Sequence, residues 1–239
     1  GKCKGVIVTG CLATRYEEEL RSELIEADDL LTIAEEPDIV HRVDRVLGRQ
    51  PRGHVASMPR ATTTPSHWSY LRISDGCDHK CAFCAIPAIR GQHKSEPIEA
   101  LIHEAEQLAV QGTRELVLVS QDSVRYGADL YGRSHLVELL QAIEGVDGID
   151  WMRLMYTYPA FWTEEMMQFY ASSPKMCAYI DMPLQHIADP VLRRMKRATT
   201  KRKTVDLLSE LRSRMPDVGL RSTFIVGFPG ETENDFEEL

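Results

Sequence analysis

Three cysteines share one short segment of the chain, with the spacing Cys77-x-x-x-Cys81-x-x-Cys84. They follow the apolar run 70–73, which predicts a buried strand that ends just before a tight loop. Three thiolates on one loop can hold three irons of a cubane iron–sulfur cluster. Because no fourth cysteine lies nearby in the sequence, one iron would stay open to chelate a small molecule. The segment therefore predicts a site of chemistry at the end of a strand.

The same spacing also suits zinc. The three cysteines, with His79 or His93, could make a closed tetrahedral site in a non-catalytic, zinc-stabilised binding module. Two neighbouring features favour iron and sulfur. Phe83 precedes the third cysteine, where its ring could lie against a bound ring system. The loop also opens a long run of alternating strand and helix patterns, which a small zinc module would not need.

Composition limits the function classes. The chain has 239 residues, 43% of them hydrophobic and 27% charged, which is typical of a globular protein with one large core or two domains. No apolar run approaches the ~20 residues of a transmembrane helix, and no signal peptide is visible at the start. A net charge of −8 argues against a generic nucleic-acid binder. Six cysteines, three of them clustered, fit a reducing compartment, so we expect a cytoplasmic protein without disulfides.

Positive charge is concentrated in one block, Arg193-Arg194-Met195-Lys196-Arg197, continued by Lys201-Arg202-Lys203. The pattern favours a solvated helix face, and the alternative is a contact surface for phosphate or an acidic partner. We expect no direct nucleic-acid binding and no membrane contact from this part of the chain.

The first part of the chain, residues 1–48, predicts two strands and two helices. The strands are expected at 6–9 and 30–33, and the helices around Leu20 and Val43. Residues 49–67 are rich in Pro, Thr, Ser, Gly and Arg without periodicity, which predicts a linker between domains. The chain starts in a strand pattern and stops in a helix pattern, so we expect a piece of a longer protein.

Residues 68–239 predict a second domain with repeated strand–helix units. Strands are expected at 70–73, 116–119, 151–156, 178–182 and 220–226, with amphipathic helices between them. Such units with right-handed crossovers build a parallel sheet that curls into a barrel or part of one. Reactive groups then gather at the carboxyl ends of the strands. The cysteine loop lies there, as do the segments 120–122, 156–158, 183–186 and 227–230.

The loop Cys-x-x-x-Cys-x-aromatic-Cys after the first barrel strand resembles the radical S-adenosylmethionine superfamily. Within it the chain is similar to the methylthiotransferase family, closest to the RimO branch, which methylthiolates an aspartate of a small-subunit ribosomal protein. The motifs that carry this resemblance are Val8-Thr9-Gly10-Cys11-Leu12, Arg72-Ile73-Ser74-Asp75-Gly76-Cys77-Asp78-His79, Ala85-Ile86-Pro87, Arg90-Gly91, Met182-Pro183-Leu184-Gln185-His186-Ile187 and Phe224-Ile225-Val226-Gly227-Phe228-Pro229-Gly230-Glu231.

The resemblance implies an α/β fold: a radical S-adenosylmethionine partial (βα) barrel, truncated at its C-terminus and preceded by part of an α/β N-terminal methylthiotransferase domain. Cys77, Cys81 and Cys84 match the ligands of a radical-generating 4Fe–4S cluster. Cys11 matches the last of three ligands of a second, auxiliary 4Fe–4S cluster, whose other two cysteines would lie upstream of residue 1. Cys3 matches no family ligand.

The implied reaction is reductive cleavage of S-adenosylmethionine, whose radical takes hydrogen from the β-carbon of an aspartate. The implied partners are the ribosomal substrate and a one-electron reductant such as flavodoxin or ferredoxin. A sister branch, which acts on an adenosine of transfer RNA, is the nearest alternative. Weaker expectations concern cofactor binding, and they fall on the following residues: Phe83, Gln121, Asp122, Arg153, Gln185, Gly227 and Gly230. Arg153 needs a partner on its apolar strand, either a cofactor carboxylate or a buried Asp or Glu.

Overall fold

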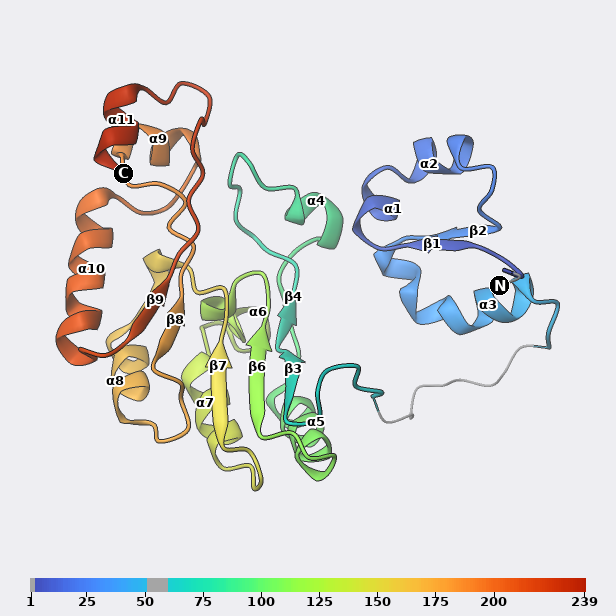
Figure 1. Cartoon of the computed structure of the whole chain (residues 1–239), viewed down its shortest axis with the longest axis horizontal. Helices are drawn as coiled ribbons and strands as arrows, with labels where there is room; N and C mark the ends of the chain where they lie inside the picture. Colours follow the sequence, from blue (N-terminus) through green and yellow to red (C-terminus); the bar gives the residue numbers. More distant parts are fainter. Residues whose placement is uncertain (1–2, 51–59) are drawn as a thin grey trace. The chain divides into compact units, whose positions relative to one another are not determined.

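The computed structural model describes residues 3–50 and 60–239, and the chain divides into two compact units (Figure 1). The first comprises Gly1–Ala61 and Ala85–Gly91, and the second comprises Thr62–Cys84 and Gln92–Leu239. Part of the expected linker, residues 51–59, lies outside the described residues. The segment Ala85–Gly91 differs from expectation, because it belongs to the first unit although the sequence placed it in the second domain.

The first unit is a small α/β structure. Strands β1 (Ile7–Thr9) and β2 (Asp29–Leu31) pair in parallel, which agrees with the sequence pattern. The first expected helix is split at Tyr16 into two pieces. The helices of this unit are α1 (Cys11–Arg15), α2 (Glu17–Glu23), a 3-10 helix (Ile33–Asp38), α3 (Ile39–Val46) and α4 (Ile86–Arg90).

The second unit is built on parallel strands. β3 (Trp68–Arg72), β6 (Glu115–Val119) and β7 (Trp151–Leu154) form one sheet in the order β3-β6-β7. β8 (Tyr179–Asp181) and β9 (Gly219–Arg221) form a second parallel pair. An isolated parallel bridge from Met152 to Met176 joins β7 to the segment that leads into β8. This succession is a partial barrel, which confirms the expected fold class.

Helices follow the strands as the apolar periodicity predicts (Figure 1). The spacing of Leu101, Ala105 and Leu108 buries one face of α5, and α7 buries Leu139 and Leu140 in the same way. The helices of the second unit are α5 (Ile98–Val110), α6 (Ala128–Tyr131), α7 (Leu136–Glu144), α8 (Glu164–Ser172), α9 (Asp189–Arg194), α10 (Lys201–Arg214) and α11 (Glu233–Glu238). None of the helices in the described ranges has the length and apolar character needed to cross a bilayer.

Two features of the second unit depart from expectation. A short antiparallel hairpin of β4 (Ser74–Asp75) and β5 (Lys94–Ser95) brackets the cysteine loop, and two-residue strands leave no periodic signal. The last expected strand, 220–226, ends at Arg221, where β9 stops. Phe224 then makes only an isolated bridge to Gln185, and it is about half exposed.

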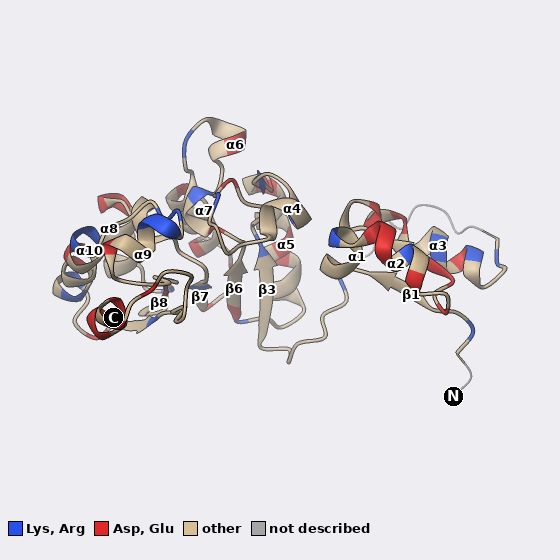
Figure 2. Cartoon of the chain, turned by 90° about the horizontal axis from the view of Figure 1, so that it is seen from above, with Lys and Arg blue, Asp and Glu red and all other residues tan. Residues whose placement is uncertain are grey.

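The basic block is not a uniform solvated face. Figure 2 shows blue residues on α9 and α10 and red residues on α11. Arg194 lies 3.8 Å from the Asp235 carboxylate, and Lys201 Nζ lies 2.7 Å from Glu238 Oε1. Part of the positive charge is therefore balanced within the chain.

Replacing the core residue Leu118 tests this packing. Leu118 is fully buried in β6 and belongs to the core cluster that also includes side chains of α5 and α7. We expect Leu118→Ala to lower the free energy of unfolding by about 2–5 kcal/mol, because it leaves a cavity in the sheet. Val110 is 90% exposed at the end of α5, so Val110→Ala should stay within about 0.5 kcal/mol of the wild type. Denaturant unfolding followed by circular dichroism measures both, and equal effects would contradict the assignment of this core.

Candidate functional site

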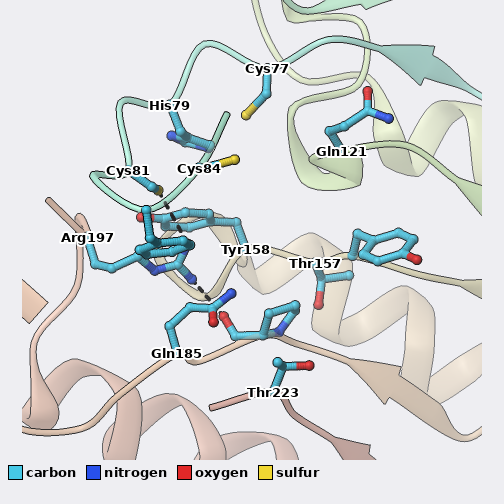
Figure 3. Close-up of a pocket in the computed structure, with 13 residues that line it drawn as sticks. Cys77, His79, Cys81, Cys84, Gln121, Thr157, Tyr158, Gln185, Arg197 and Thr223 are labelled. Carbon is cyan, nitrogen blue, oxygen red and sulfur yellow. Dashed lines mark hydrogen bonds between the residues drawn. The ribbon is translucent and has the colours of Figure 1, made fainter. Parts of the chain in front are cut away.

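A cavity of about 290 Å³ lies where the carboxyl ends of the barrel strands meet the cysteine loop (Figure 3). Its walls come from segments that follow five strands, β3, β6, β7, β8 and β9. The lining residues are Cys77, His79, Cys81, Phe83, Cys84, Gln121, Tyr156, Thr157, Tyr158, Pro183, Gln185, Arg197 and Thr223. The structure thus brings together the three cysteines, Phe83, Gln121 and Gln185, as parallel pairing requires of segments that follow neighbouring strands.

The three thiols differ in their exposure. Cys77 is buried, Cys81 is half-buried and Cys84 is exposed, and all six cysteines of the chain are free. Burial raises the pKa of the Cys77 thiol to about 11, and the neighbouring Asp122, Cys84 and Cys81 add to this effect. A buried thiol with a raised pKa stays protonated unless a cation replaces the proton.

The arrangement of donors bears on the choice between zinc and a cluster. Zinc needs its ligands within about 2.0–2.3 Å of one point. In the described parts of the chain, no three His, Cys, Asp or Glu side chains are grouped closely enough to hold a single ion. The three thiols lie on the side of the cavity that the cysteine loop forms (Figure 3). Three thiols that do not converge on one point suit a cubane, where each sulfur binds a different iron.

His79, inside the cysteine loop, is held by an acid and by aromatic rings. Its Nε2 lies 2.6 Å from Asp122 Oδ2, and Asp122 is buried. Its ring stacks on Tyr158 and Phe161, with ring centroids 4.3 and 5.5 Å away. Asp122 is not among the residues that line the cavity, and its contact with His79 holds the loop between Cys77 and Cys81. Its assignment to cofactor binding stays a prediction.

Buried polar atoms in the cavity wall lack partners. Gln121 Oε1, Gln185 Oε1 and Arg197 Nε have no hydrogen-bond partner among the described residues. Gln121 and Gln185 lie on different walls of the cavity (Figure 3). Buried acceptors and donors are usually satisfied, so these atoms are available to a polar ligand or to water in the cavity.

Backbone strain gathers around the same cavity. The non-glycine residues with positive φ in the described chain are Tyr156 (60°), Gln185 (71°) and Lys196 (55°). Tyr156 and Gln185 line the cavity, and Lys196 precedes the lining residue Arg197. Residues held in the left-handed region cluster at functional sites, because only a surrounding structure with a fixed shape keeps them there.

Arg153 is not among the residues that line the cavity, and of its two expected partners the structure shows a protein carboxylate. Its Nε donates to Glu115 Oε1 at 2.7 Å, and its guanidinium lies 4.8 Å from the centroid of the Tyr179 ring. The partner is thus a carboxylate of the neighbouring strand β6. Successive side chains of a strand point to opposite faces of the sheet, and Arg153 lies on the face where it meets Glu115.

Gly227 and Gly230 are also absent from the cavity wall. Both have positive φ, and the Gly230 carbonyl accepts a hydrogen bond from Arg194 Nη2 at 2.6 Å. The Gly230 carbonyl therefore fastens this loop to α9.

Cys11 lies in the first unit as the first residue of α1, and it is exposed. Arg90 Nη2 lies 3.9 Å from its sulfur. The assignment of Cys11 to a second cluster stays a prediction.

Several lining residues escaped the sequence reasoning. The sequence treated Arg197 as part of a solvated basic block, yet it lies against Cys81 and Tyr158. Thr223 was expected inside a strand that in fact ends earlier. Tyr158 lies in the segment 156–158, which the sequence already placed at the end of a strand, whereas no local pattern pointed to Arg197.

Cysteine alkylation tests the burial of the loop in the metal-free protein. The pKa of Cys77 is about 11, so at pH 8, three units lower, roughly one Cys77 thiol in a thousand is ionised. We expect iodoacetamide to modify Cys84 first, and the rate at Cys77 to climb as the pH rises toward 11, because the thiolate is the nucleophile. Peptide mass spectrometry measures both rates. Equal rates at Cys77 and Cys84 across pH 7–9 would contradict the described burial.

Comparison with known proteins places this site in a family. The Radical SAM superfamily model matches residues 71–239. The chain is 44% identical over its full length to the ribosomal protein uS12 methylthiotransferase RimO of Pelotomaculum thermopropionicum, and covers 56% of that protein. It is 45% identical to the same-named protein of Flavobacterium johnsoniae over 98% of this chain and 52% of the relative. The chain spans about half the length of the curated relatives it matches.

Solved structures agree on the fold. The radical S-adenosylmethionine methyltransferase TsrM of Kitasatospora setae superposes with a TM-score of 0.69 at 15% identity, over 98% of this chain and 52% of that one. The cobalamin-dependent S-adenosylmethionine radical enzyme OxsB gives a TM-score of 0.65 at 11% identity, over 92% of this chain and 36% of that one. With its cysteine loop at the carboxyl ends of a partial parallel barrel, this chain belongs to the radical SAM superfamily.

Proposed function

We propose that this chain is the radical-generating part of an enzyme that methylthiolates the β-carbon of an aspartate in ribosomal protein uS12. The observation that carries the proposal is the cavity itself. Three thiols from one loop line it together with Gln121, Gln185 and Arg197, each of which has a buried polar atom without a partner. The relatives named as uS12 methylthiotransferases, at 42–46% identity, supply the substrate class.

Different residues of the cavity would bind the cluster and the cofactor. Cys77, Cys81 and Cys84 would hold a 4Fe–4S cluster, whose chemistry when bound is one-electron cleavage of the carbon–sulfur bond of S-adenosylmethionine. Phe83 offers an apolar surface that is 37% exposed, suited to the adenine ring. Gln121 and Gln185 present buried oxygens to the polar groups of the cofactor. Such a wall orients the reacting carbon and keeps water from it.

Cys11 would join ligands outside this chain in the auxiliary cluster, and a small one-electron carrier such as flavodoxin or ferredoxin would reduce the first cluster. Free cysteines throughout the chain suit a reducing, cytoplasmic setting.

Substrate choice is tested with the full-length protein. Anaerobically reconstituted enzyme is given either a peptide carrying the uS12 aspartate loop or a transfer-RNA stem-loop, with S-adenosylmethionine and dithionite. We expect a methylthio mass increase on the peptide alone. Modification of the stem-loop alone would replace the proposal with the transfer-RNA activity.

Iron content and EPR test the cluster site. We expect a Cys77→Ala/Cys81→Ala/Cys84→Ala variant of the full-length protein to lose the four irons and the S-adenosylmethionine-sensitive EPR signal of one cubane. Cys177 lies outside the cavity wall, so Cys177→Ala is the matched control and should keep both. Stoichiometric zinc in place of iron in the wild type would contradict the proposal that this is a radical S-adenosylmethionine enzyme.

Cofactor affinity tests the cavity wall. We expect Gln121→Leu to weaken S-adenosylmethionine binding about tenfold, because one buried hydrogen bond to the ligand is lost. Arg153→Gln should leave the affinity within about twofold, since Arg153 pairs with Glu115 away from the cavity. Isothermal titration of the reconstituted protein measures both. A larger loss in Arg153→Gln than in Gln121→Leu would reverse the roles assigned to them.

A further inference from the structure

We propose that Arg197 is a positioning residue that ties Cys81 to the opposite wall of the cavity and raises the reduction potential of the cluster bound there. The inference rests on the proposed function, because it concerns the cluster that the three cysteines would hold.

Arg197 contacts both sides of the cavity at once. Its Nη1 donates to Cys81 Sγ at 3.8 Å, and its Nη2 donates to the Pro183 carbonyl at 2.7 Å (Figure 3). Its guanidinium carbon lies 3.9 Å from the centroid of the Tyr158 ring. The planar fork of an arginine allows these contacts together, whereas a lysine amine is a single point of charge.

The backbone beside Arg197 makes a second link to the cysteine loop. The Ala82 amide donates to the Met195 carbonyl at 3.0 Å. Met195 is fully buried at the end of α9, where it packs with Val191. Lys196 then takes a positive φ of 55°, which ends the helix and turns the next residue toward the loop. The amides of Lys196 and Arg197 donate to the carbonyls of Arg193 and Leu192, so this helix cap fixes the direction in which Arg197 leaves α9.

The charge of Arg197 has a predictable electrostatic effect. Among the described residues that line the cavity, Arg197 alone carries a permanent charge. Its side chain is partly removed from water, where charges interact more strongly than at the surface. A cluster gains a negative charge on reduction, so a nearby cation and a hydrogen bond to a ligand sulfur stabilise the reduced form. Arg197 therefore makes the first electron transfer easier.

The potential is measured by anaerobic redox titration of the reconstituted full-length protein with EPR detection. We expect Arg197→Gln to lower the midpoint potential by about 59 mV, which is a tenfold change in the ratio of reduced to oxidised cluster. Arg197→Lys keeps the charge, so its midpoint potential should stay close to that of the wild type. Arg194→Gln is the matched control, because Arg194 lies on α9 but binds the Gly230 carbonyl instead of a cysteine. Equal potentials in wild type and Arg197→Gln would overturn the electrostatic role.

Positioning is measured without the cluster. In the cluster-free protein we expect hydrogen exchange of the segment around Ala82 to be several-fold faster in both Arg197→Gln and Arg197→Lys, since neither keeps the fork. Arg194→Gln should exchange as the wild type does. Unchanged exchange in both Arg197 variants would overturn the positioning role. A wild type that holds no iron would overturn the proposed function instead, while the exchange experiment would still decide the link between Arg197 and the loop.

Discussion

Parallel pairing of β3, β6 and β7 is the constraint on which the site depends. Leu71 pairs with Leu118, and Leu118 pairs with Leu154, so the three strands end at one edge of the sheet. Every wall of the cavity is a segment that follows one of these strands or one of the pair β8–β9. A strand shifted by one residue would turn its buried leucines to the opposite face and move its loop away from the others.

The cysteine loop has almost no regular structure of its own, so its shape comes from neighbours. The β4–β5 hairpin holds its base. The His79–Asp122 pair holds its middle, and the contacts of Ala82 and Arg197 hold its far side. These contacts come from three different strand–helix connections. A loop supported in this way presents its thiols in a set arrangement before any metal arrives, which lowers the entropic cost of binding.

Local patterns predicted most of the fold. The apolar spacing of α5 and α7 and the continuous apolar run of β6 give the right elements, because burial on one face leaves a periodic trace in the sequence. The prediction was wrong where the apolar pattern extends past the paired residues or where a strand is too short to show one. β9 is shorter than its apolar run, since Phe224 follows a segment that no longer pairs as a strand. The two-residue strands β4 and β5 are too short to show a periodic pattern of apolar residues.

By itself, the sequence determined the thiol spacing and the strand–helix order that places the loop at the end of a strand. Both are local properties of neighbouring residues. Only the tertiary structure decided that Arg153 pairs with Glu115 and that Arg197 leaves a basic block to contact Cys81. Arg197 and Cys81 lie 116 residues apart in the chain. A contact over that separation depends on strand register and helix ends together, and no spacing within either segment encodes it.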